Sequence, residues 1–233
     1  MKYYLIKNND TLSGVPIFLD AVLSEQFDKK DPMPPMRYDW RRKTSEGRKA
    51  PFPDELYLVA KNKLLKSDYI SDFGGFIVSK EMLKIIEASR VKPFDKVKLN
   101  TLGWKGKKIT DKEYYFIDYL FNNRLENINY QKSLFAWDIS ELKYSKKTKE
   151  QLKEIEYSAF IKGFKEIFLD DTKFDVFQLR NSKISGHLIC NENFKQEVIK
   201  NNLYGMEFIE LPNLGDLFES SYNYGQIEWN RTS

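Results

Sequence analysis

The sequence predicts an α+β fold, with a mixed, mostly antiparallel sheet and two or three helices. Short apolar or alternating runs, typical of strands, recur along the whole chain of 233 residues. Few segments have the capped, amphipathic character of a helix, and strands do not alternate regularly with long helices. A doubly wound parallel sheet requires that alternation, so the sequence disfavours it.

Strands are expected where aliphatic, aromatic or β-branched residues form short runs between turn residues. In chain order these runs are 2–7, 55–60, 76–78, 94–99, 113–120, 134–139, 164–169, 175–179, 187–190 and 206–211. Residues 17–24 are mostly apolar and fit a strand or a helix equally well. Turns are expected at 72–75, 103–108 and 170–173, which are rich in Gly, Asp or Lys.

Helices are predicted from their end signals. Ser79 is a plausible N-cap for a helix over 80–89, with Pro93 as its stop signal. Asn191 is a plausible cap for a helix over 192–200, and Gly205 follows where the chain must reverse. A third, short surface helix is expected over 146–156, which is charged with sparse apolar residues.

A weak internal repeat links the two capped helices. Residues 76–99 and 187–211 share one plan of strand, cap, helix, break and strand. The alignment places Glu81 with Glu192, Leu83 with Phe194, and Lys84 with Lys195. The repeat predicts two similar strand–helix–strand units packed on a shared sheet.

A single α+β domain is expected over residues 1–212, with a C-terminal tail over 213–233. Within the domain, residues 27–53 contain five prolines among charged residues. Proline disfavours both helix interiors and sheet ladders, so this stretch is interpreted as a long surface loop. Loops of this length are commonly functional.

Composition excludes several classes. The single cysteine, Cys190, cannot form an internal disulfide, and the single histidine, His187, excludes sites that need two imidazoles. No apolar run reaches the ~20 residues that span a bilayer. The N-terminus turns polar after Ile6 and lacks the apolar core of a signal peptide, so the expected compartment is the cytoplasm.

Three sets of residues could carry chemistry, and each has a simpler interpretation. His187 and Cys190 would point to opposite faces of a strand, which favours a buried structural cysteine over a catalytic pair or a zinc site. The carboxylates of Asp170, Asp171 and Asp175 could bind a divalent cation, but a turn needs the same residues. The triplet 141–143 (ELK) matches half of a nuclease motif, which a charge-rich chain also produces by chance. No catalytic residue, metal or cofactor is therefore expected.

Two pieces of the sequence carry a family resemblance. The first is 175–179 (DVFQL) followed by 187–211, which ends in the Gly-aromatic strand GMEF at 205–208. The second is 128–135 (INYQKSLF), which follows the aromatic strand 113–120. Together they resemble bacterial immunity proteins of polymorphic toxin systems, families eleven and forty-three, over about residues 55–212. The resemblance implies a cytoplasmic antidote that binds and blocks a cognate protein toxin, without catalysis.

Such an antidote needs a few aromatic and arginine anchors on its surface. The basic stretch 37–49 contains the first candidates, and other exposed aromatics are second candidates. The complete set of expected anchors is Arg37, Tyr38, Trp40, Arg41, Arg42, Trp104, Tyr222, Tyr224 and Trp229. The alternative is a metal-dependent nuclease or a nucleic-acid-binding protein that uses the patch 37–49. The net charge of only +4 disfavours nucleic acid, and no membrane partner is expected.

Overall fold

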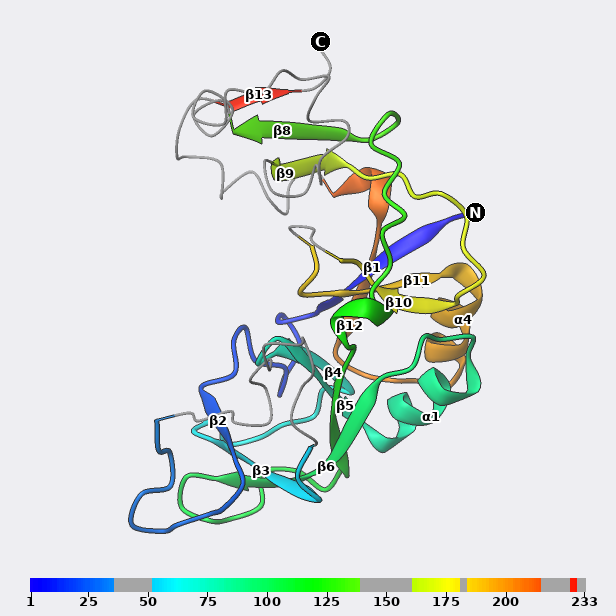
Figure 1. Cartoon of the computed structure of the whole chain (residues 1–233). Helices are drawn as coiled ribbons and strands as arrows, with labels where there is room; N and C mark the ends of the chain where they lie inside the picture. Colours follow the sequence, from blue (N-terminus) through cyan, green and yellow to red (C-terminus); the bar gives the residue numbers. More distant parts are fainter. Residues whose placement is uncertain (36–51, 139–160, 181–183, 215–226, 230–233) are drawn as a thin grey trace. The chain divides into compact units, whose positions relative to one another are not determined.

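The computed structural model describes residues 1–35, 52–138, 161–180, 184–214 and 227–229 (Figure 1). The chain divides into two compact units, and each has a core of its own. The first unit comprises residues 1–6, 124–195 and 208–233, and the second comprises 7–123 and 196–207. The chain therefore passes between the units four times, and the expectation that residues 1–212 fold as one domain stays a prediction.

The second unit is built on a six-stranded sheet with the order β2-β3-β6-β7-β5-β4. The strands in this order are β2 (Ala21–Ser24), β3 (Glu55–Ala60), β6 (Asp95–Gly103), β7 (Tyr114–Asp118), β5 (Gly75–Ser79) and β4 (Tyr69–Asp72). Only β3 and β6 pair in parallel; the other pairs of this sheet are antiparallel. Aliphatic and aromatic residues of these strands, such as Leu58, Ile77 and Phe116, form one buried core.

Two smaller sheets complete the described strands. One has the order β10-β11-β1-β12 and the other β13-β8-β9. Their strands are β10 (Val176–Gln178), β11 (Leu188–Asn191), β1 (Tyr3–Asn8), β12 (Met206–Glu210), β13 (Ile227–Trp229), β8 (Leu134–Asp138) and β9 (Ile161–Glu166). The core of the first unit lies among them and includes Tyr3, Phe135 and Phe177. Leu214 belongs to this core and β13 pairs with β8, so the segment expected as a tail contains packed residues and a strand.

Both capped helices are confirmed. Helix α1 (Lys80–Ala88) begins after Ser79, whose hydroxyl oxygen accepts a hydrogen bond from the N–H of Met82 at 3.1 Å. Helix α4 (Glu192–Lys200) begins after Asn191, whose Oδ1 accepts from the N–H of Phe194 at 3.0 Å. The helix expected over 146–156 lies outside the described residues. Among the described helices, none has the length and apolar character needed to cross a membrane.

The internal repeat is present in the topology. In each copy an antiparallel strand pair leads into the helix, and a further strand follows it: β4-β5-α1-β6 and β10-β11-α4-β12. In each sheet one strand is inserted between the strands that flank the helix, β7 in one and β1 in the other. The inserted strand follows the repeat in the first copy, whereas the N-terminus of the chain supplies it in the second.

The structure corrects two features of the predicted repeat. The copies lie in separate sheets, not in a shared one: β4, β5 and β6 belong to the six-stranded sheet, and β10, β11 and β12 to the four-stranded sheet. When the two copies are aligned on their N-caps, Ser79 and Asn191, the alignment shifts by one residue. Met82 is then equivalent to Phe194, and Ile86 to Val198. These four side chains are buried, so the caps and the buried faces agree.

Local boundaries differ from the predictions at several places; for example, β9 spans Ile161–Glu166 where a strand over 164–169 was expected, and β6 continues to Gly103. Strand β4 was not expected, because its short sequence YISD carries little hydrophobic signal. The ambiguous segment 17–24 forms a strand only from Ala21. Helix α1 ends at Ala88, before Pro93, since Ser89 is extended and its N–H donates to the carbonyl of Ile86. Its hydroxyl donates to the carbonyl of Ile85 at 2.7 Å, so Ser89 supplies the stop that the sequence assigned to proline.

Replacing the two caps tests the account of the helices. Ser79→Ala should lower the free energy of unfolding by about 1 kcal/mol, because the N–H of Met82 loses its acceptor. Asn191→Ala should cost about 2 kcal/mol, since it also removes the 2.8 Å bond from Nδ2 to Asp175. Urea unfolding monitored by circular dichroism measures both. Ser13→Ala is the control, because this exposed serine caps no helix. If the cap variants had the same urea midpoint as this control, the cap assignment would be wrong.

Candidate functional site

Most of the expected anchors lie outside the described residues. These are Arg37, Tyr38, Trp40, Arg41 and Arg42 in residues 36–51, and Tyr222 and Tyr224 in residues 215–226. Trp229 lies on β13, opposite Ala136 of β8. Trp104 is described, and half of its surface is exposed to solvent.

The three sets of residues that could carry chemistry lie in different structural surroundings. Cys190 is fully buried on β11, and burial raises the pKa of its thiol, so it belongs to the core. His187 lies in the bend before that strand. The triplet 141–143 lies outside the described residues.

The acidic residues around 170–175 each contact a different protein group. Asp170 accepts from Asn129 at 2.7 Å, Asp171 lies 3.5 Å from the N-terminal amine, and Asp175 accepts from Asn191. Among the described residues, no group of three or more His, Cys, Asp or Glu side chains is arranged to hold a metal ion.

Two depressions are lined by described residues of the second unit, and both linings are mixed. One, of about 300 Å³, lies beside β6, and two of its lysines have neighbouring acids: Lys98 lies 3.8 Å from Glu113, and Lys112 pairs with Asp68. The other, of about 450 Å³, lies beside α1 and is bordered by Ile85, Ala88 and Leu203. Its lining also includes the polar and charged residues Glu81, Lys84, Ser89, Glu197 and Asn201.

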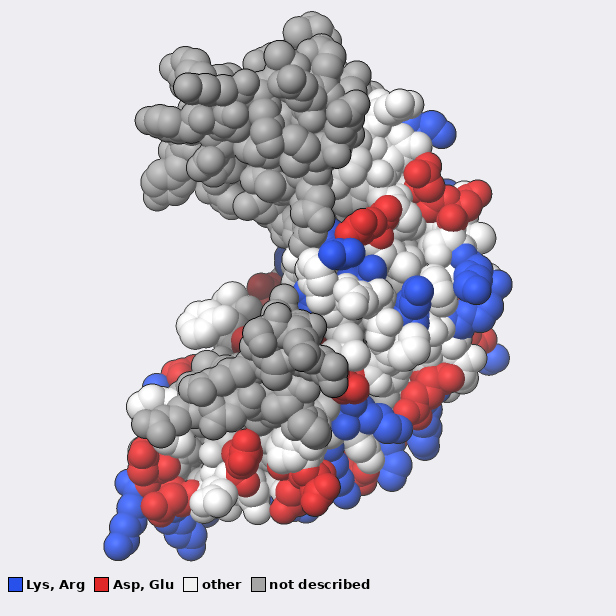
Figure 2. Space-filling view, in the orientation of Figure 1, with Lys and Arg blue, Asp and Glu red and all other residues white. Residues whose placement is uncertain are grey.

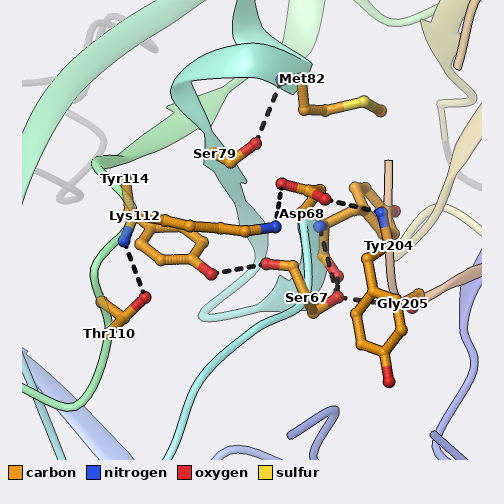
Figure 3. Close-up of polar contacts among 10 residues, drawn as sticks. Ser67, Asp68, Ser79, Met82, Thr110, Lys112, Tyr114, Tyr204 and Gly205 are labelled. Carbon is orange, nitrogen blue, oxygen red and sulfur yellow. Dashed lines mark hydrogen bonds and ion pairs between the residues drawn. The ribbon is translucent and has the colours of Figure 1, made fainter. Parts of the chain in front are cut away.

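Asp68 is a buried polar residue of the second unit with several hydrogen-bond partners (Figure 3). Its carboxylate accepts from Nζ of Lys112 and from the N–H of Tyr204, each at 2.6 Å. Its own N–H donates to the carbonyl of Tyr204 at 2.7 Å, and its carbonyl accepts from the N–H of Ser79. We call this set the Asp68 clamp, because it fastens the segment after α4 to the start of β4 and to the cap of α1.

Ser67 extends the clamp on the preceding residue. Its hydroxyl donates to the carbonyl of Tyr69 at 2.6 Å, and its carbonyl accepts from the hydroxyl of Tyr114 at 2.7 Å. Burial raises the pKa of that hydroxyl, which keeps Tyr114 protonated as a donor. A Cβ on Gly205 would come within 2.4 Å of Oγ of Ser67, and Gly205 has a φ of +92°. Only glycine fits here without strain.

Three irregular segments beside the clamp are joined by backbone hydrogen bonds. Lys61 donates to the carbonyl of Asp20 at 2.9 Å, Lys66 to that of Gly14 at 3.0 Å, and Leu65 to that of Ile109 at 2.9 Å. The N–H of Trp104 donates to the last residue of β3, Ala60. We call residues 12–20, 61–66 and 103–109 the three-loop surface. The parallel pair β3–β6 explains its position, since both strands end there and β2 begins there.

Apolar side chains are concentrated on this surface. Among the described residues, six large hydrophobic side chains are exposed, and four of them belong to the three-loop surface. These four are Ile17 and Phe18, each 76% exposed, Leu64 at 43% and Trp104 at 50%. Sequence reasoning found only Trp104. The exposure of Ile17 and Phe18 was not anticipated, because the sequence predicts a strand or helix over residues 17–24. The strand begins only at Ala21.

The charge of the surface is strongly unbalanced. It carries the exposed lysines Lys61, Lys63, Lys66, Lys105, Lys107 and Lys108, and a single carboxylate, Asp20, which pairs with Lys61 at 3.0 Å. Nζ of Lys105 lies 5.0 Å from the ring centre of Trp104. The adjoining residues 25–31, whose Phe27 ring meets Gly106, add three acids and two lysines. Elsewhere, on the face in Figure 2, acidic and basic side chains are interspersed over the described surface.

Both pieces of sequence that carry the family resemblance have structural roles. In 128–135, the carbonyl of Asn129 accepts from the hydroxyl of Ser133 at 2.7 Å, and the same hydroxyl accepts from the N–H of Phe168. In 205–208, Gly205 belongs to the contact with Ser67 described above. Residues of both motifs therefore help to hold the fold together.

Comparison with known families agrees with this resemblance. The sequence model of the family described as Immunity protein 43 matches residues 7–226. The chain belongs to this family. Of the two suggested families, the match is to forty-three, and it extends well beyond the region 55–212 on which the resemblance rested. No curated protein sequence matches the chain. Membership of an immunity protein family implies a cognate toxin as partner.

The clamp predicts a sharp contrast between two glycines. Gly205→Ala should lower the free energy of unfolding by about 2 kcal/mol or more, because the methyl group meets Ser67 and φ is unfavourable. Gly186→Ala is the matched control, since nothing lies within 4 Å of its added Cβ, and it should change stability by less than about 0.5 kcal/mol. Equal urea midpoints for the two variants would contradict the contact with Ser67.

A double-mutant cycle tests the ion pair of the clamp. Lys112→Met should lower the free energy of unfolding by about 1–3 kcal/mol, because the buried carboxylate of Asp68 loses its cation. Asp68→Asn should also destabilise the protein. The double variant should lose less free energy of unfolding than the two single variants lose together, with a coupling energy of about 1 kcal/mol or more. Strictly additive urea midpoints would show that the two side chains do not stabilise each other.

Proposed function

We propose that this chain neutralises a cognate bacterial toxin by binding it stoichiometrically and covering its active site or substrate groove. The observation that carries the proposal is the match to an immunity protein family over residues 7–226. A match of this extent includes both units of the chain. The proposed activity needs no catalytic group on this chain, and the proposed compartment is the cytoplasm.

Steric inhibition has physical requirements that the described residues support. An inhibitor gains affinity when its contact surface is already ordered, because less conformational entropy is lost on binding. The sheets provide rigid support, and backbone hydrogen bonds join the segments at the ends of β3 and β6. Exposed aromatic side chains supply the few contacts that dominate binding energy. The anchors proposed in residues 37–42 would add to such a surface.

Co-expression tests the function directly. The toxin encoded beside the gene for this chain should arrest growth of a bacterial host, and this chain should restore growth, whereas an unrelated immunity protein should not. The purified pair should form a complex of defined stoichiometry by light scattering, with loss of toxin activity in proportion to the added chain. Rescue at strongly substoichiometric amounts would indicate catalysis, and steeply salt-dependent DNA or RNA binding without rescue would support the nucleic-acid alternative.

A further inference from the structure

We infer that the three-loop surface is the contact surface for the toxin, and that it fits a partner face with an apolar centre bordered by carboxylates. This inference rests on the proposed function and adds the place and the chemistry of the contact. Its basis is the coincidence, in three short segments, of exposed apolar side chains, excess positive charge and a backbone that is already ordered.

The apolar component is more than ordinary surface exposure. Single exposed hydrophobic residues are common in soluble proteins and need no explanation. Here four of the six large exposed examples among the described residues occur in three segments that hydrogen-bond to one another. Grouping of this kind is typical of interaction sites, and tryptophan is the residue type most enriched among binding hot spots.

The Asp68 clamp makes this surface rigid before any partner arrives. Ser67 and Asp68 directly follow Lys66, the last residue of the second segment. Tyr204, whose N–H is bound by Asp68, donates its hydroxyl to the carbonyl of Ser13 in the first segment at 3.1 Å. Two of the three segments are therefore held by one hydrogen-bond network. A preordered surface loses less entropy on binding and favours tight inhibition.

Charge identifies the kind of partner. Six exposed lysines against one paired aspartate call for carboxylates on the opposing face. The adjoining residues 25–31 reduce this positive excess by only one charge. Lysines at the rim of an interface mainly accelerate association, and the apolar centre determines how slowly the complex dissociates.

Other occupants fit less well. In a symmetric dimer the same patch meets itself, which would place lysines against lysines. A nucleic acid would match the lysines, but single-stranded bases stack on aromatic rings, and Ile17 and Leu64 provide only aliphatic surface. A protein with a mixed apolar and acidic face satisfies both components of the surface.

Alanine variants of exposed apolar residues test the apolar centre. The probe is the purified toxin encoded beside this gene, and the dissociation constant is measured by calorimetry. Trp104→Ala and Phe18→Ala should each weaken binding about 30-fold, the effect of a hot-spot residue. Ile199→Ala is the matched control, because Ile199 is 51% exposed on α4, and it should change affinity less than threefold. Urea midpoints confirm that each variant is folded.

Charge reversal tests the rim. Lys105→Glu combined with Lys107→Glu should lower the association rate about tenfold at low salt and flatten its salt dependence. The control pair, Lys132→Glu with Lys173→Glu, reverses two exposed lysines elsewhere, one of which also lies over an aromatic ring. Its association rate should fall by less than threefold.

The outcomes separate this inference from the proposed function. If the unaltered chain does not bind the toxin, the proposed function fails. If it binds, and the Trp104 and Phe18 variants bind as tightly as the Ile199 variant, the toxin contacts another surface and the inference alone is wrong. A dimer abolished by Trp104→Ala, or RNA binding abolished by the lysine reversal while toxin binding persists, would also overturn it.

Discussion

The second unit depends on one buried carboxylate, that of Asp68. A buried charge is costly unless it is paired and hydrogen-bonded, and this one has a lysine and a backbone N–H as partners. The backbone of the same residue bonds to Tyr204 and to the cap of α1. A distant part of the chain, residues 196–207, is thereby made a component of the second unit. Gly205 completes the arrangement, because a side chain there would displace Ser67.

The repeat explains why a chain of this length forms several sheets. Each copy contributes a strand pair, a helix and a further strand, and leaves a gap between the strands that flank the helix. In the six-stranded sheet β7 fills that gap, and in the four-stranded sheet the N-terminal strand β1 fills it. Unpaired strand edges expose backbone donors and acceptors, so filling the gap locally satisfies them. The N-terminal strand β1 therefore lies between β11 and β12, which come far later in the sequence.

Sequence reasoning succeeded where the determining interactions are local. Ser79 and Asn191 cap helices because a side-chain oxygen reaches an N–H three residues later, which can be read from sequence. It failed on the division into sheets, because strand pairing joins residues far apart, such as Tyr4 with Cys190. It also could not anticipate the clamp, since nothing local links Asp68 to Tyr204. At the surface, Trp104 was expected to be exposed and is, whereas the exposure of Ile17, Phe18 and Leu64 was not anticipated.

The missed residues show which signal could have found the surface. The segments 61–66 and 103–109 together contain six lysines and no acid, although the whole chain has a net charge of only +4. Because these lysines exceed the net charge, the rest of the chain must carry an excess of negative charge. The net charge therefore understates the positive potential at this surface. Apolar residues within such a segment remain exposed because adjacent lysines stay solvated. Short basic segments that contain Trp or Leu therefore indicate an exposed surface of mixed apolar and positive character, which the total charge of the chain does not reveal.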